Sequence, residues 1–298
     1  MSLKVYIDGK HVSKEDAKVS VWDHGLLYGD GIFEGIRAYS GNIFKLQEHI
    51  DRLYNSAKSL CMEIPLSQKE MTDAVVETCR LNNITDGYVR LVVTRGVGDL
   101  GLDPKKCSKS TIIIIADKIQ LYPEEKYKKG LKVTISSVRK NFPESMNPKV
   151  KSLNYLNNIL AKIEAGHAGA DEIVQINING YVCECSADNI FIVKNGVLHT
   201  PHPSVGLLEG VTRDTVIEIA KKEQLEVRED FLTSHDLYVA EEMFLTGTGA
   251  EIISVVWLNG RTIGDGKPGP VTKLLLERYR EIVKTDGVKI NDTDKAQV

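Results

Sequence analysis

The chain has 298 residues, of which 42% are hydrophobic and 27% charged, and its formal net charge is −3. This length fits one large domain or two ordinary ones, and the composition is that of a globular protein. Charges of both signs are interspersed without a basic stripe, so we expect no nucleic-acid partner. The longest apolar run, around residues 112–116, is too short to span a bilayer, and the N-terminus carries no secretory signal. We therefore expect a cytoplasmic protein.

Residues 1–118 predict a small α+β domain. Apolar residues at 46, 50, 53, 54, 57 and 60 follow a helical period, and Ser67 with Glu70 forms a capping box at the start of a second helix. The expected elements in chain order are a strand at 3–7, a hairpin of 32–39 with 42–46, helices at 46–60 and from Ser67, and strands at 88–94 and 111–116.

Residues 119–130 are polar, contain Pro123 and end in a charge run, so they predict an interdomain connection. A larger domain is expected over residues 131–298. Its expected elements are a strand at 131–138, a helix after Lys151, hairpins with Asn-Gly turns at 179–180 and 195–196, a helix near Thr212 and a helix at 270–283. The polar tail after Lys284 is expected to fray.

Two patterns suggest sites and are better explained otherwise. Gly96-Val-Gly98-Asp-Leu-Gly101 matches the dinucleotide fingerprint, but Pro104 and then a β-branched run follow it instead of a helix. Cys183 and Cys185 would share a strand face, but no nearby residue completes a tetrahedral metal set. We expect neither dinucleotide binding nor a metal site. The odd count of five cysteines also argues against a disulfide framework.

Lys151 and Tyr155 are four residues apart, so on a helix they would fall on one face. A lysine amine can form a Schiff base with a carbonyl compound, and a phenol can hydrogen-bond the resulting system. On spacing alone, two residues on a solvated helix are the more common interpretation, and Lys149 is a competing amine.

Seven motifs in one order, over residues 6–274, give the chain its resemblance to a known family. It resembles the fold-type IV pyridoxal phosphate enzymes, and among them the branched-chain amino-acid aminotransferases. The motifs are Tyr28-Gly-Asp-Gly-Ile-Phe-Glu-Gly-Ile-Arg37, His49-Ile-Asp-Arg52-Leu, Tyr88-Val-Arg90, Lys151-Ser-Leu-Asn-Tyr155-Leu, Gly180-Tyr-Val-Cys-Glu184-Cys-Ser-Ala-Asp-Asn189-Ile-Phe, Leu208-Glu-Gly-Val-Thr212-Arg and Thr246-Gly-Thr-Gly-Ala-Glu251.

The resemblance implies a two-domain α+β fold of the D-amino-acid aminotransferase type, with the domain at 131–298 carrying the cofactor lysine. It implies pyridoxal 5'-phosphate held as a Schiff base on Lys151. Tyr155 would bond the ring's phenolic oxygen and Glu184 its pyridine nitrogen. A helix start near Thr212 suits a phosphate, because free N–H groups and the helix dipole favour anions there. The implied cofactor-binding set is Arg52, Lys151, Tyr155, Glu184, Leu208, Gly210, Val211, Thr212, Gly247 and Thr248.

By the same resemblance, Tyr88 would help hold the substrate α-carboxylate, and Arg90 with Tyr28 would receive the γ-carboxylate of glutamate. Tyr28 comes from the neighbouring subunit in the family, which implies a homodimer or a higher homo-oligomer. The implied substrate set is Tyr28, Phe33, Gly35, Arg37, Tyr88, Arg90, Thr248 and Gly249. Two positions depart from the family pattern, with Cys185 where Gly is common and Gly249 where Ala is common.

The expected function is reversible amino transfer between L-leucine, L-isoleucine or L-valine and 2-oxoglutarate by a ping-pong mechanism, with small molecules as the substrates. A D-amino-acid aminotransferase and an aminodeoxychorismate lyase on the same fold are the enzymatic alternatives. A cofactor-free binding module that kept the fold is the non-enzymatic one. The residues around Tyr122 and Tyr127 lack the tryptophan-bearing pattern of some relatives, which leaves one pocket wall unassigned.

Overall fold

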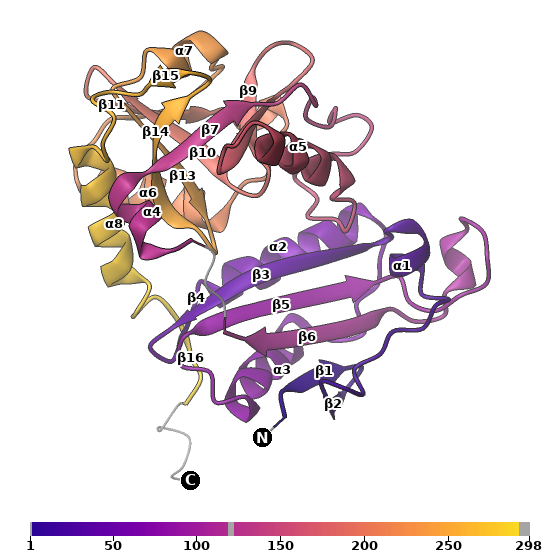
Figure 1. The fold of residues 1–298 in the computed structure, drawn as a ribbon. Helices are drawn as coiled ribbons and strands as arrows, with labels where there is room; N and C mark the ends of the chain where they lie inside the picture. Colours follow the sequence, from indigo (N-terminus) through magenta and orange to yellow (C-terminus); the bar gives the residue numbers. More distant parts are fainter. Residues whose placement is uncertain (1, 119–121, 292–298) are drawn as a thin grey trace. The chain divides into compact units, whose positions relative to one another are not determined.

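The computed structural model describes residues 2–118 and 122–291, which fall into two compact units (Figure 1). Unit 1 comprises Met1–Ile119, Val150–Asn154 and Ile282–Val298. Unit 2 comprises Gln120–Lys149 and Tyr155–Glu281.

The described part of unit 1 is built on a seven-stranded sheet in the order β16-β4-β3-β5-β6-β1-β2, and every neighbouring pair in it is antiparallel. The strands are β1 (Lys4–Ile7), β2 (Lys10–Ser13), β3 (Gly31–Tyr39), β4 (Asn42–Phe44), β5 (Gly87–Thr94), β6 (Thr111–Asp117) and β16 (Gly287–Lys289).

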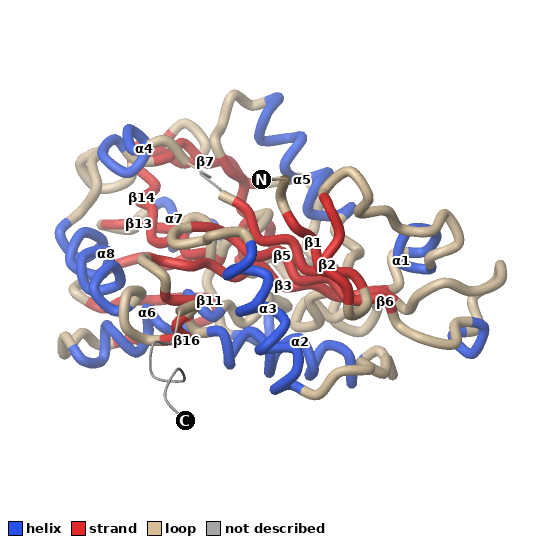
Figure 2. Tube along the Cα trace, turned by 90° about the horizontal axis from the view of Figure 1, so that it is seen from below, coloured by secondary structure: helices blue, strands red, loops and turns tan. Residues whose placement is uncertain are grey.

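Two helices cover one face of this sheet, α2 (Leu46–Ser59) and α3 (Gln68–Leu81), and Figure 2 shows both on the same side of the strands. Leu46, Ile50 and Leu53 are fully buried at helical spacing, and they pack on the alternate buried residues of β5. Each such aliphatic side chain contributes about 1.5–3 kcal/mol on burial. Unit 1 also holds the short helix α1 (His24–Tyr28) and the 3₁₀ turn η1 (Pro104–Lys106).

Unit 2 contains a mixed sheet in the order β12-β11-β10-β13-β14-β7-β8-β9, with β15 paired to β14. Its strands are β7 (Leu131–Ile135), β8 (Glu172–Ile176), β9 (Val182–Cys185), β10 (Asn189–Lys194), β11 (Val197–Pro201), β12 (Val227–Asp230), β13 (Glu242–Gly247), β14 (Glu251–Leu258) and β15 (Arg261–Thr262). Its helices are α4 (Glu124–Lys129), α5 (Leu156–His167), η2 (Pro203–Val205), α6 (Val211–Lys222), α7 (Ser234–Tyr238) and α8 (Pro270–Ile282).

The local predictions with a defined turn or cap chemistry are confirmed. Ser67 and Glu70 form both bonds of a capping box. The β3–β4 hairpin turns at Ser40 and Gly41, where φ is 49° and 76°, and the β10–β11 hairpin turns at Asn195 and Gly196, where φ is 52° and 74°. These left-handed conformations are the ones that two-residue hairpins require. The helix expected near Thr212 is α6.

The structure divides the chain differently from the expected boundaries at 118, 130 and 131. Val150–Asn154 and the segment from Ile282 belong to unit 1, because residues 151–153 pair with β3 and β16 pairs with β4. In the expected connection at 119–130, residues 124–129 form α4 within unit 2, and residues 119–121 lie outside the described residues. Residues 292–298 of the expected frayed tail also lie outside them.

Candidate active site

The predicted substrate residues of unit 1 gather on the sheet face opposite to α2 and α3. Side chains alternate along β3, so Ile32, Glu34 and Ile36 point toward the helices, and the residues between them point the other way. The β3–β5 register sets Gly35 opposite Arg90 and Arg37 opposite Tyr88. Phe33, Gly35, Arg37, Tyr88 and Arg90 therefore share one face.

Arg90 is held between two aromatic rings on this face. Its guanidinium carbon lies 4.6 Å from the ring centroid of Phe33 and 5.4 Å from that of Tyr88. These cation–π contacts fix a planar fork of N–H donors, which suits a carboxylate. Gly35 makes room for the arrangement, since a Cβ there would lie 1.9 Å from Oη of Tyr88.

Lys151 lies at the edge of β3 and not on a helix. Its carbonyl accepts from the N–H of Phe33 at 3.0 Å, and Ser152 forms a bridge with Ile32. Its Nζ lies 4.6 Å from the ring centroid of Phe33. The expectation that Lys151 and Tyr155 share a helical face is wrong, because α5 begins at Leu156 and Tyr155 is its N-cap.

Behind this face, a buried ionic cluster ties β3 to α2. The fully buried Glu34 carboxylate accepts from Nε of Arg52 at 2.8 Å, from its Nη2 at 2.7 Å and from Nδ1 of His49 at 2.8 Å. Burial raises the pKa of Glu34, but Arg52 and His49 lower it more, so the net pKa is well below its ordinary value. Burial holds the pKa of His49 below its ordinary value despite the neighbouring carboxylate.

In unit 2, Glu184 lies on β9 and is almost fully buried. Its Oε1 is 2.7 Å from Nζ of Lys140. Its Oε2 accepts from the N–H of Leu208 at 3.1 Å and from Nδ2 of Asn189 at 3.4 Å. The carboxylate is thus anchored through both oxygens. Lys140 carried no sequence signal, because nothing in its motif marks it as a buried partner.

The predicted phosphate donors lie at the start of α6. Gly210 is its N-cap and offers no side-chain cap, so the N–H groups of Val211 and Thr212 have none. A Cβ on Gly210 would lie 2.1 Å from Oδ1 of Asn189, whose amide donates to the carbonyl of Leu208 at 2.8 Å. Asn189 therefore fixes the approach of the chain to this helix start.

The second predicted turn, Gly247-Thr248-Gly249, connects β13 to β14. A Cβ on Gly247 would lie 2.0 Å from Oδ1 of Asp188, so only glycine fits there without a shift. The hydroxyl of Thr246 is buried with no hydrogen-bond partner in the described structure, and Thr246 is opposite Asn189 in the β10–β13 register. Unfilled hydrogen-bonding capacity thus lies beside the residues around Glu184.

Tyr28 lies apart from the Arg90 cluster in its contacts. Its Oη accepts from the N–H of Gly101 at 3.0 Å, and its ring meets that of His24 edge-on at 5.0 Å. The glycine-rich run at 96–101 serves here as a loop after β5, and within the described residues no α-helix opens on it.

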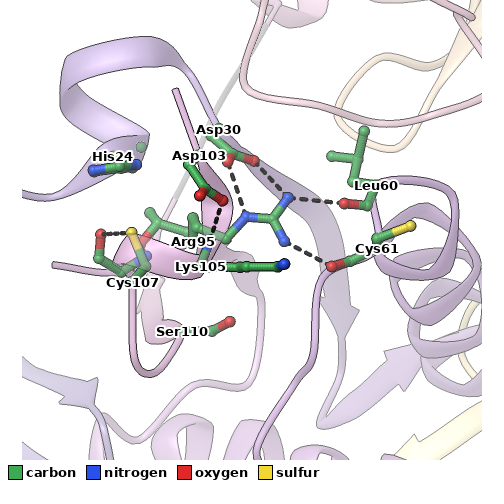
Figure 3. A network of polar contacts seen from close by, with 12 residues as sticks. His24, Asp30, Leu60, Cys61, Arg95, Asp103, Lys105, Cys107 and Ser110 are labelled. Carbon is green, nitrogen blue, oxygen red and sulfur yellow. Dashed lines mark hydrogen bonds and ion pairs between the residues drawn. The ribbon is translucent and has the colours of Figure 1, made fainter. Parts of the chain in front are cut away.

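A separate hollow of about 410 Å³ in unit 1 is lined by residues that include Cys61, Glu63, Arg95 and Cys107. Figure 3 shows the Arg95 guanidinium between the Asp30 carboxylate and the carbonyl oxygens of Leu60 and Cys61. Four of its five N–H donors are used within the protein, so Arg95 has a structural role.

Comparisons with known proteins agree with this geometry. A model of the class IV amino-transferase family matches residues 31–257. The chain belongs to the class IV aminotransferase family. A putative branched-chain-amino-acid aminotransferase from Methanocaldococcus jannaschii is 55% identical over 97% of this chain and 100% of its own length. The branched-chain-amino-acid aminotransferase of Escherichia coli K12 is 36% identical over 92% of this chain and 91% of its own length.

A solved class IV structure, the T.th. branched-chain amino acid aminotransferase with pyridoxamine 5'-phosphate, matches with a TM-score of 0.94. It is 38% identical over 98% of this chain and 99% of its own. The same protein has been solved with N-(5'-phosphopyridoxyl)-L-glutamate and with 4-methylvaleric acid. These matches confirm the predicted fold class. Among the described residues, no helix is long and apolar enough to cross a membrane.

Proposed function

We propose that this protein is a pyridoxal phosphate-dependent branched-chain amino-acid aminotransferase, which exchanges an amino group between L-leucine, L-isoleucine or L-valine and 2-oxoglutarate. The observation that carries the proposal is the β3–β5 face, where a lysine amine and a guanidinium both lie 4.6 Å from the ring of Phe33. An amine next to an aromatic wall and a carboxylate-binding fork provides the contacts needed for covalent carbonyl chemistry on an amino acid.

The residues present fit the cofactor. The N-terminus of α6 has no side-chain cap and a glycine N-cap, which suits a phosphate dianion. Glu184 offers an anchored carboxylate for a pyridine N–H, and Lys151 offers the amine that would hold the aldehyde carbon. Arg52 would add donors to the phosphate, and Thr248 a hydroxyl. When bound, the cofactor supplies an electron sink for the carbanion at the substrate Cα.

The protein's residues would divide the remaining work. Nζ of Lys151 would remove the proton from Cα of the amino acid and later return a proton to the 2-oxo acid's Cα in the reverse half-reaction. Tyr88 would hold the α-carboxylate. Arg90 would receive the γ-carboxylate of glutamate, and the ring of Phe33 would contact an aliphatic side chain instead. One site would thereby serve both substrates of a ping-pong cycle.

Two findings in relatives support this substrate pair. The T.th. branched-chain amino acid aminotransferase has been solved with a phosphopyridoxyl derivative of L-glutamate and with 4-methylvaleric acid, one acidic and one branched aliphatic ligand. Relatives at high coverage bear the same enzyme name.

We also propose a cytoplasmic homodimer. Leu156, Ile159, Leu160 and Ile163 form an exposed apolar stripe on α5, which is unusual for a solvated helix and typical of a covered one. Tyr28 would be contributed by the neighbouring subunit. Sedimentation at micromolar concentration tests the oligomer, since a strict monomer would contradict it.

Borohydride trapping tests the lysine. Purified protein saturated with pyridoxal phosphate is reduced and digested, and peptide mass spectrometry locates the adduct, which we expect on Lys151. Lys149→Ala is the matched control, because Lys149 is half-exposed and paired with Glu209. Lys151→Ala should lose the visible absorbance and amino transfer, while Lys149→Ala keeps both. An adduct on Lys149 would overturn the assignment, and conversion with D-alanine but not L-leucine would move it to the D-amino-acid enzyme.

Arg90→Gln tests the substrate pair. A charge-assisted carboxylate contact contributes about 1.5–3 kcal/mol, so kcat/KM for glutamate should fall about 10- to 150-fold. The value for leucine should change far less. Equal losses for both substrates would contradict the γ-carboxylate role.

A further inference from the structure

Lys140 is a buried lysine that the proposed mechanism does not use. It lies in the loop after β7, only 4% exposed, and no sequence motif pointed to it. Burying an ammonium group costs free energy unless a counter-charge compensates it, and a buried ion pair seldom stabilises a fold more than apolar residues would. Its presence beside Glu184 therefore calls for a reason besides stability.

The backbone around Lys140 is fixed by its neighbours. Its N–H donates to the carbonyl of Ile176 at 3.0 Å, and the carbonyl of Arg139 accepts from the amide of Asn157 at 3.0 Å. The ammonium lies 2.7 Å from Oε1 of Glu184 and 3.4 Å from Oδ1 of Asn158. These bonds come from β8 and α5, so the position of the ammonium is set before any ligand binds.

The Glu184 carboxylate has one acceptor position to spare. An ionised carboxylate offers about four lone-pair sites. In the described structure Lys140, Asn189 and the N–H of Leu208 occupy three of them, one on Oε1 and two on Oε2. With both oxygens engaged, the carboxylate cannot rotate freely about its terminal bond. The remaining site keeps a defined direction.

We propose that Lys140 is a positioning residue that holds the Glu184 carboxylate in the orientation in which its last acceptor site receives the pyridine N–H of the cofactor. The inference rests on the function proposed above. Without the ammonium, Oε1 would lose its charged partner and the carboxylate would turn toward other donors. The N–H to carboxylate bond would then weaken, while contacts to the phosphate and to Lys151 would stay.

The test compares binding of pyridoxal phosphate and of 1-deaza-pyridoxal phosphate, in which a C–H replaces the pyridine nitrogen. Dissociation constants are measured on cofactor-free protein by absorbance titration, and selectivity is the ratio of the deaza constant to the pyridoxal phosphate constant. Wild type should prefer pyridoxal phosphate, and Glu184→Gln should lose that preference. Lys140→Met should lower the selectivity about tenfold, in the range known for residues that orient a ligand-binding group. Lys140→Arg should stay within about threefold of wild type.

Lys162→Met is the matched control. Lys162 also pairs with a buried carboxylate of unit 2, at 2.6 Å from Oε2 of Glu172, but it is not next to Glu184 among the described ion pairs. It should keep the wild-type selectivity. If Lys140→Met does not fold, as judged by circular dichroism, Lys140→Gln replaces it in the same comparison, since it keeps a donor without the charge.

The outcomes separate the two ideas. Equal weakening of both ligands in Lys140→Met would mean a merely structural role and overturn the inference, as would unchanged selectivity. A wild type that binds pyridoxal phosphate but shows no selectivity, with or without Glu184, would remove the pyridine assignment of Glu184 and this inference with it. A wild type that binds neither ligand would refute the proposed function itself.

Discussion

Replacing Glu34 by glutamine should destabilise unit 1 strongly, because Glu34 is the buried counter-charge of Arg52. The carboxylate is fully buried and accepts three hydrogen bonds of 2.7–2.8 Å, and the Arg52 side chain is only 15% exposed. Glutamine keeps the volume but presents at least one N–H group to these donors. Breaking a buried pair by removing one partner costs about 3–5 kcal/mol, so we expect a loss of about that size.

Asp30→Asn is the matched control. Asp30 forms a similar two-pronged pair with Arg95, but it is 26% exposed, and Arg95 also donates to the carbonyls of Leu60 and Cys61 (Figure 3). Arg95 therefore keeps two partners, and we expect a loss of only about 1 kcal/mol.

The assay is urea unfolding of the cofactor-free protein. The chain has two tryptophans, so in a Trp257→Phe background the fluorescence of Trp22 reports on unit 1 alone. A Glu34→Gln loss no larger than that of Asp30→Asn would refute the reasoning, since the difference in burial would then have no energetic consequence.

Three further predictions follow from burial and close contact. The pKa of Glu34 is lowered in the fold, so its stabilisation is complete above its unfolded value of about 4.3 and is lost as pH falls below that; the stability gap between wild type and Glu34→Gln should shrink from pH 6 to pH 3, and a constant gap would contradict this. Gly35→Ala should lower kcat/KM about tenfold, because its Cβ would meet Oη of Tyr88 at 1.9 Å; Gly166→Ala, whose Cβ meets nothing within 4 Å, should not. Burial raises the pKa of Cys79 and Cys183 to about 12, and Cys185 is also buried, so only Cys61 and Cys107 should react with Ellman's reagent before unfolding; a third fast thiol would argue against this packing.

Sequence periodicity and turn chemistry predicted those parts of the fold that depend on nearby residues. The apolar stripe of α2 and the capping box at Ser67 are local, and the structure has both. β14 was missed because it is buried along most of its length and shows no alternation of apolar and polar residues. The pairing of residues 151–153 with β3 was missed because it joins segments more than 100 residues apart.

The candidate site divides in the same way. Tyr88 and Arg90 are two apart on one strand, so their shared face follows from alternation. Phe33 joins them through the β3–β5 register, which only the structure gives. Lys140 and Glu34 could not be identified as partners of Glu184 and Arg52, since an ion pair between distant segments depends on tertiary packing and leaves no periodic mark in the chain.

The make-up of unit 1 has a consequence for how the protein is made. Its sheet receives β1 to β6 from the first 119 residues, but β16 is contributed by Gly287–Lys289, near the end of synthesis. Until then the outer edge of β4 has unpaired backbone groups on a nascent chain, and the start of β3 waits for residues 151–153. The lysine-bearing segment thus docks before the sheet is closed, and the ribosome must release almost the whole chain before unit 1 is complete.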